Sequence, residues 1–192
     1  EIMASNSQTL RDGDVEDADE GDKGGAYSDW IEIYNSDTQP INLTGYSLSD
    51  SGATWTLPQC TVEAKGYLLI WASDKDKVAK DGQLHTNFKL SASGENVVLK
   101  MPNGTIVDSV TFLSLSDDQS YGRKTDGASG FELFTKSTPF DKNANGIVLV
   151  KDPVFSKVGG FYTGEFDLKI TSDIPGAKIY YTTDGSEPLP GS

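Results

Sequence analysis

Short runs of β-branched and aromatic residues recur about every ten residues along this chain, and clusters of Gly, Pro, Asn, Asp and Ser separate them. This spacing is typical of an all-β sandwich, in which short strands alternate with tight turns. The pattern therefore predicts an all-β fold.

The run "WIEIYN" predicts a strand with two different faces. Trp30, Glu32 and Tyr34 share one face, because successive side chains of a strand point to opposite sides of the sheet. Ile31 and Ile33 share the other face. We expect this strand to be half buried.

Two further patterns place strands near the middle of the chain. The run "YLLIWA", residues 67–72, is continuously apolar, as expected of a strand that is covered on both faces, and we place it at the centre of the core. The tight-turn signal Pro-Asn-Gly at 102–104 lies between two β-rich runs. It predicts a hairpin that spans residues 96–112.

The segment "SDKDKVAKDG", residues 73–82, differs from the rest of the chain because it favours a short helix. Ser73 or Asp74 would cap that helix. A further strand is predicted later in the chain at "FELFT".

The order of these patterns indicates two domains. The segment "KSTPFDKNANG" has the Pro, Asn and Gly content of a domain end, and the strand pattern restarts at Pro153. We predict a first domain at residues 1–148 and a second unit at residues 149–192. About 40 residues are near the lower size limit for a stable core without a metal, disulfide or partner.

The charge balance excludes several classes of partner. Lys and Arg number 16 and Asp and Glu number 29, which gives a net charge of -13. Such a chain repels the phosphate backbone of nucleic acids and anionic membrane surfaces. The longest apolar run, "YLLIWA", is also too short to span a bilayer, so we expect neither nucleic-acid binding nor a membrane span.

The first domain resembles a known family. The segments "SDWIEIYNSDTQPINLTGYSLSDSGATWTLP" and "LHTNFKLSASGENVVLKMPNGTIVDSVTF" resemble the lamin tail domain, and its bacterial branch most closely. The closing "SYGRKTDG" and "STPFDKN" also fit, so the resemblance covers residues 1–145 in order. It implies an immunoglobulin-like β-sandwich, in which Trp30 and Phe88 supply core area and Asp29 braces the start of its strand.

The second unit resembles another module. The segment "PVFSKVGGFYTGEFDLKITSDIPGAKIYYTTDGSEP" is similar to the immunoglobulin-like module at the C-terminus of chitobiases. That module has further strands, so the resemblance implies a partial, truncated second immunoglobulin-like β unit. Bacterial proteins with this pair of modules are usually exported and multi-domain, which implies an extracellular or cell-surface location.

The sequence contains no recognisable catalytic motif. It has no Gly-x-Ser-x-Gly elbow, no phosphate loop and no His and Cys cluster with zinc spacing. The single His85 lies in "LHTNF" and is expected to be a hydrogen-bonded structural residue, and the single Cys60 is expected to be a small apolar filler. We therefore predict that the chain is not an enzyme.

The stretch "RDGDVEDADEGDKGG", residues 11–25, holds seven carboxylates. Calcium takes six to eight oxygen ligands and tolerates irregular loops. The EF-hand pattern fails here, because a loop that starts at Asp12 needs Gly at its sixth position and Glu at its twelfth, and the sequence has Asp17 and Lys23 there. Two interpretations remain: a solvated surface loop whose carboxylates are exposed and unpaired, or a calcium site of another kind. The candidate ligands of that calcium site are Asp14, Glu16, Asp17, Asp19, Glu20, Asp22 and Asp29.

These patterns together predict a non-catalytic recognition or spacer module that binds a protein or glycan at the cell surface through its loops. One alternative is an accessory segment of a larger enzyme, either kinase-like of the spore-coat-H type or carbohydrate-active. Another is a calcium-stiffened adhesion module. The strand edges of a partial second unit also predict self-association or packing on the first domain.

Overall fold

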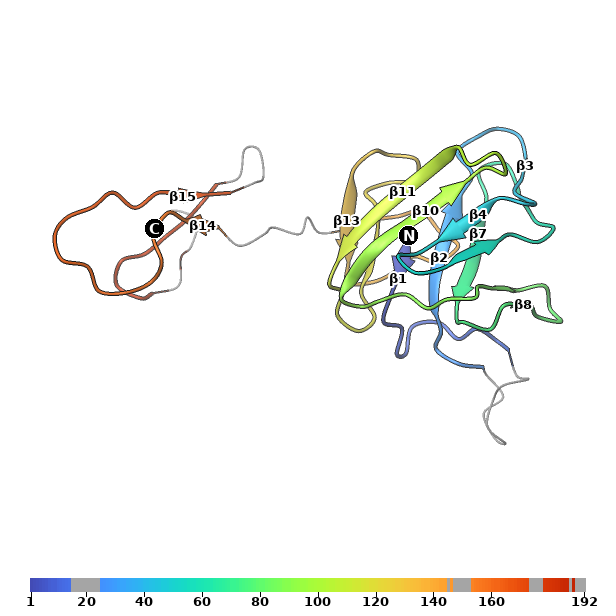
Figure 1. The fold of residues 1–192 in the computed structure, drawn as a ribbon, viewed down its shortest axis with the longest axis horizontal. Helices are drawn as coiled ribbons and strands as arrows, with labels where there is room; N and C mark the ends of the chain where they lie inside the picture. Colours follow the sequence, from blue (N-terminus) through green and yellow to red (C-terminus); the bar gives the residue numbers. More distant parts are fainter. Residues whose placement is uncertain (15–24, 145, 147–152, 173–177, 187, 189–192) are drawn as a thin grey trace. The chain divides into compact units, whose positions relative to one another are not determined.

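The chain folds into two compact units, Glu1–Val148 and Leu149–Ser192, each of which is described by itself (Figure 1). The computed structural model describes residues 1–14, 25–144, 146, 153–172, 178–186 and 188. Every regular element in this described part is a β-strand, so the predicted all-β fold is confirmed.

The first unit is an immunoglobulin-like β-sandwich built from two main sheets. The larger sheet has seven strands in the order β13 (Phe131–Phe134), β12 (Ser120–Arg123), β1 (Ile2–Met3), β2 (Asp29–Tyr34), β7 (Tyr67–Ala72), β9 (Leu84–His85) and β8 (Lys77–Val78). The smaller sheet has four strands in the order β11 (Ile106–Leu113), β10 (Gly94–Lys100), β4 (Ser47–Ser49) and β5 (Thr54–Thr56). A separate antiparallel pair consists of β3 (Ile41–Asn42) and β6 (Thr61–Val62).

The main core lies between the two sheets. Ile31 and Ile70 come from the larger sheet, and Leu48, Val97 and Phe112 come from the smaller one. All five side chains are buried in one cluster, because alternate residues of each strand point inward. Burial of this apolar area is the main stabilising contribution to such a sandwich.

A second apolar cluster covers the outer face of the larger sheet. Trp30 and Trp71 are cross-strand partners there, packed with Met3 and Leu69 and covered in part by Leu10. The expectation that β2 is half buried is therefore wrong, because both of its faces are covered. The prediction that β7 is central and covered on both faces is confirmed. It pairs with β2 on one side and with β9 on the other, and its side chains are buried in both clusters, Ile70 in the inner one and Trp71 in the outer one.

The predicted hairpin is confirmed as β10 and β11, which pair from Gly94↔Leu113 onward. The turn between them is closed by the Met101 N–H, which donates to the Thr105 carbonyl at 2.8 Å. Gly104 has a φ of +85°, a conformation that other residues rarely adopt.

The predicted helix at residues 73–82 is absent, and the segment instead contains strand β8. Asp74 and Asp76 have φ values of 61° and 48°, which a right-handed helix excludes. Their N–H groups donate to the carbonyls of Phe88 and Thr86, both at 3.0 Å. Pairing with a distant segment therefore overrides the local helix preference.

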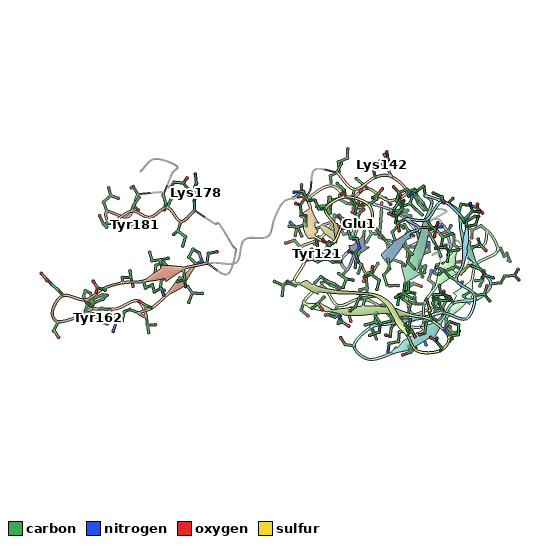
Figure 2. The ribbon with its side chains drawn as sticks, turned by 90° about the horizontal axis from the view of Figure 1, so that it is seen from above. Glu1, Tyr121, Lys142, Tyr162, Lys178 and Tyr181 are labelled. Atoms are coloured by element: carbon green, nitrogen blue, oxygen red, sulfur yellow. The ribbon has the colours of Figure 1, made fainter. Side chains whose placement is uncertain are left out.

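In the described residues of the second unit there is one antiparallel pair, β14 (Val154–Phe155) with β15 (Ile170–Thr171). Tyr162, which is labelled in Figure 2, forms a tilted ring pair with Phe166, with the ring centroids 4.6 Å apart. Among the described residues of this unit, none is buried. Its exposed large apolar side chains are Val154, Phe155, Val158, Phe161, Tyr162, Phe166, Leu168, Tyr180 and Tyr181.

Two leucines of the smaller sheet test this assignment of the core. Leu48 is 2% exposed and Leu113 is 54% exposed. Leu48→Ala should lower the free energy of unfolding by about 3 kcal/mol, because it leaves a cavity between the sheets. Leu113→Ala, the matched control, should change it by less than about 0.5 kcal/mol. Urea unfolding followed by tryptophan fluorescence measures both, and equal losses would contradict the assignment.

Candidate functional site

One buried carboxylate, that of Asp12, connects the two ends of the acidic segment. The Asp12 side chain is fully buried and accepts hydrogen bonds from the backbone N–H groups of Asp14 and Ala26 at 3.1 and 2.9 Å. It also accepts from Ser28 Oγ at 2.8 Å and from Lys75 Nζ at 2.9 Å. These bonds tie residue 12 to residue 26, so the two ends of the acidic segment are held together.

Asp14 is also buried and lies between two lysines. Its Oδ2 atom is 3.0 Å from Lys75 Nζ and 2.7 Å from Lys77 Nζ. Burial by itself would raise the pKa of Asp14, but these lysines outweigh it and hold that pKa well below its usual range. The expectation that the carboxylates of residues 11–25 are exposed and unpaired is therefore wrong for Asp12 and Asp14.

Asp29 lies apart from that pair of lysines. Its Oδ1 atom accepts from the Asn6 backbone N–H at 3.2 Å, at the start of β2. Burial raises the pKa of Asp29 to about 6, although the hydrogen bonds it accepts act in the opposite direction. Asp29 thus braces the start of its strand, as the sequence suggested.

The remaining candidate calcium ligands lie outside the described residues. They are Glu16, Asp17, Asp19, Glu20 and Asp22. Within the described part of the chain, no group of three or more His, Cys, Asp and Glu side chains is arranged to hold a metal ion. Calcium binding by the acidic segment therefore stays a prediction.

The single histidine and the single cysteine both lie in environments that favour their uncharged forms. His85 is buried on β9, and its Nδ1 atom lies 2.9 Å from Ser73 Oγ. Burial lowers the pKa of His85 and raises the pKa of Cys60, so each environment favours the neutral form.

A cavity that the sequence did not predict lies between the sheets of the first unit. It has a volume of about 110 Å³, and its apolar wall includes Ile31 and Ile33 of β2. Val97 and Leu99 of β10 and Val110 of β11 line the opposite side. Glu1, which precedes β1, and Tyr121 of β12 also line the cavity, and both are labelled in Figure 2.

Carboxyl groups gather at the mouth of this cavity. Glu32 is buried, and its Oε2 atom accepts from the Phe140 N–H at 2.6 Å. Burial, together with the nearby carboxylates of Glu1 and Asp126, raises the pKa of Glu32 to about 7. Asp126 accepts hydrogen bonds from the Tyr67 hydroxyl and from the Asn143 N–H. The mouth is therefore acidic.

Half-buried aromatic rings also line the mouth. Tyr34 and Tyr67 are cross-strand partners with ring centroids 5.1 Å apart. Tyr121 stacks on Phe131 at 5.6 Å. Aromatic faces next to acidic groups attract cations and the apolar faces of sugars.

One ion pair spans the two sheets beside the cavity. Arg123 of β12 donates to both carboxylate oxygens of Asp108 on β11, at 2.6 and 2.7 Å. Its guanidinium also lies 4.7 Å from the Phe131 ring centroid. Arg123 is thus engaged by Asp108 and by the Phe131 ring.

The alternating sequence of β2 shows that Glu32 shares a face with Trp30 and Tyr34. The sequence does not predict the cavity, because the walls of the cavity come from strands that lie far apart in the chain. The structure brings together residues near positions 1, 33, 98, 110 and 123. No local pattern carries that information.

Comparison with known proteins identifies both parts of the chain. Residues 7–114 match the Lamin Tail Domain family, and residues 157–192 match the Chitobiase/beta-hexosaminidase C-terminal domain family. Both kinds of domain are immunoglobulin-like and are typically non-catalytic accessory modules. The search of curated proteins gave no match. In the described part of the chain, no helix has the length and apolar character needed to cross a bilayer.

The buried carboxyl of Glu32 makes stability depend on pH. Because its folded pKa of about 7 is above the ordinary value of 4.5, the folded state binds the proton more tightly, and this stabilisation is lost as the pH rises from 4.5 through 7. Glu32→Gln removes the ionisable group and still accepts the Phe140 N–H. From pH 5 to pH 8 its stability relative to the parent chain should rise by on the order of 2 kcal/mol.

Urea unfolding at both pH values measures this difference. Glu63→Gln, at an exposed position, is the control and should follow the parent chain at each pH. A Glu32→Gln chain that gains nothing between pH 5 and pH 8 would show that the carboxyl is not buried as described.

Proposed function

Because the chain belongs to the lamin tail domain family, we propose that it is a non-catalytic recognition module of an exported bacterial surface protein. The chitobiase-like match supports an extracellular setting, since it relates the second unit to a module of secreted glycosidases. In this proposal the rigid sandwich presents a binding site for a protein or glycan partner.

The observation that carries the proposal is the acidic, aromatic mouth of the inter-sheet cavity. Glu32 and Asp126 supply carboxyl groups there, and Tyr34, Tyr67 and Tyr121 supply ring faces. A concave apolar site with a few convergent polar groups is the usual form of a binding site.

Arrays of cell-wall glycans and of surface-protein peptides test this function with the intact 192-residue chain. Tyr121→Ala should weaken binding of any partner that uses the mouth by about tenfold, because a stacked ring contributes about 1 kcal/mol or more. Tyr27→Ala removes an equally large ring that lies next to Arg11 instead, and it should leave binding unchanged. No binding on either array, or equal losses in both variants, would reject the proposal.

The second unit supports a further part of this proposal, which is self-association. None of its described residues is buried, and it exposes a set of large apolar side chains that includes Phe155 and Phe161. Exposed apolar surface of this kind usually marks a contact with another chain or domain.

Calcium binding is the second candidate function, and one observation favours it. The hydrogen bonds of Asp12 to Ala26 hold the two ends of the acidic segment together, so Glu16, Asp17, Asp19, Glu20 and Asp22 belong to a closed loop. A closed loop loses less conformational entropy when it wraps a cation. Asp14 is already neutralised by Lys75 and Lys77, so we do not include it among the ligands.

Calorimetric titration with calcium, together with a thermal melt, tests this candidate. Calcium should release heat and raise the melting temperature by a few degrees, since ligand that binds only the folded state stabilises it. A chain with Asp17, Asp19 and Asp22 changed to Asn is the matched variant and should lose both effects. A parent chain with neither heat nor shift would end the calcium proposal.

A further inference from the structure

The strand β11 is the outermost strand of the smaller sheet in the described part of the chain. It pairs with β10 on one side, and Figure 1 shows these two strands side by side. With eight residues it is also the longest strand among the described residues. Its regular part runs from Asp108 to Leu113, and most of these residues are exposed. The other side of β11 is therefore an open strand edge.

Backbone groups of β11 point to this open edge. Asn96 Nδ2 of β10 donates to the Val110 carbonyl at 3.3 Å, so that carbonyl points toward β10. The N–H and carbonyl groups of an antiparallel strand alternate between its two sides. Those of Ser109 and Thr111 therefore point away from β10, where another strand could accept and donate hydrogen bonds.

The next carbonyl along β11 gives the same direction. The Phe112 carbonyl oxygen faces Gly94 of β10 so closely that a Cβ atom at Gly94 would lie 2.7 Å from it. By the same alternation, the backbone groups of Thr111 and Leu113 point to the open edge.

The usual devices that protect an edge strand are absent from this part of β11. Natural proteins block exposed edges with lysine, proline, bulges or free charges. Residues 106–113 contain neither lysine nor proline, and the register shift of the pair lies at Leu99 and Lys100. The one charged residue of β11, Asp108, accepts hydrogen bonds from Arg123 at 2.6 and 2.7 Å, so its charge is neutralised.

The outer face of the smaller sheet is free of carboxylates, although the chain has a net charge of -13. Leu48, Trp55 and Val97 are buried in the core, so the residues that alternate with them point outward. These outward residues on β4 and β5 are serines and threonines, and Lys100 is the one charged residue among those on β10. Two copies of so acidic a chain repel each other least where such a face and its edge meet.

We propose that the open edge of β11 pairs with β11 of a second copy of this chain, antiparallel and about a two-fold axis at Val110. The two smaller sheets would then form one continuous sheet across the contact. Hydrogen bonds would form in both of the symmetry-related pairs of Ser109 with Thr111 of the second copy. This contact is separate from the self-association proposed for the second unit and does not depend on the recognition site at the cavity.

The sequence of β11 matches itself in this arrangement. Residues directly opposite each other in a sheet point to the same face, so the two-fold axis has to pass through a residue. An axis at Val110 places the Ser109 and Thr111 hydroxyl groups opposite each other and one Val110 opposite the other. An axis at Thr111 would instead place Ser109 opposite Leu113. Matched cross-strand pairs stabilise a sheet, which favours Val110 as the centre and a second copy as the partner.

Light scattering of the intact 192-residue chain, over a concentration series that reaches millimolar protein, tests the contact. The parent chain should approach the mass of two chains. Thr111→Pro removes one edge N–H from each copy and should raise the dissociation constant of the dimer by at least about tenfold. A parent chain that keeps the mass of one chain throughout the series would overturn the proposal.

Thr56→Pro on β5, the other edge of the same sheet, is the matched control. The Leu57 N–H donates to the Tyr46 carbonyl at 2.8 Å, so the Thr56 N–H points away from β4 by alternation. This variant should dimerise like the parent chain. Equal weakening by Thr56→Pro and Thr111→Pro would overturn the assignment to β11.

Thermal melts establish that the variants are folded. If Thr111→Pro unfolds, Thr111→Lys takes its place, because an exposed lysine blocks an edge without removing a backbone donor. Phe161→Asp separates this contact from one made by the second unit. A dimer that Phe161→Asp abolishes and that the Thr111 variant leaves intact would assign the association to the second unit and overturn the proposal.

Cysteine cross-linking tests the centre of the contact. With Cys60 changed to Ala in both chains, Val110→Cys should form a disulfide between two copies on mild oxidation. Thr111→Cys should do so at least about tenfold more slowly, because the axis at Val110 places the two Thr111 side chains beyond the Cβ separation of about 4 Å that a disulfide needs. Faster cross-linking at Thr111 than at Val110 would overturn the proposed pairing.

Discussion

The antiparallel pairing of β2 with β7 is the interaction on which the rest of the first unit depends. It places Ile31 beside Ile70 on the inner face and Trp30 beside Trp71 on the outer face. Both faces then carry large apolar surfaces that have to be covered. The smaller sheet covers the inner one, and the segment around Leu10 contributes to covering the outer one.

Covering the outer face has an electrostatic consequence. The chain that passes over this face continues through Asp12 and Asp14, which become buried with it. A buried carboxylate is strongly unfavourable unless it is paired and hydrogen-bonded, and Lys75 and the neighbouring N–H groups meet that need. The same segment thus packs against the sheet and holds the acidic loop at its base.

Unlike Asp12 and Asp14, Glu32 is buried without a lysine partner in the described part of the chain. This difference separates carboxylates that stabilise the fold from a carboxyl group that is suited to binding. Asp12 and Asp14 have lysine partners that lower their pKa, whereas burial raises the pKa of Glu32. Such perturbed groups in concave sites are typical of functional surfaces. At that surface the carboxyl groups of Glu32 and Asp126 lie beside an apolar cavity lined by β2, β10 and β11.

The sequence by itself determined the strand pattern, the hairpin of β10 and β11, the central position of β7 and the likeness to the lamin tail domain. These features follow from local alternation and turn chemistry, which a short segment carries in full. Only the tertiary structure decided that residues 73–82 contain the short strand β8 in place of a helix, that β2 is covered on both faces and that Asp12 is buried. Each depends on a distant partner: Asp12 meets Lys75 across 63 positions of sequence. The cavity between the sheets likewise has walls from strands that lie far apart in the chain, so no local pattern records it.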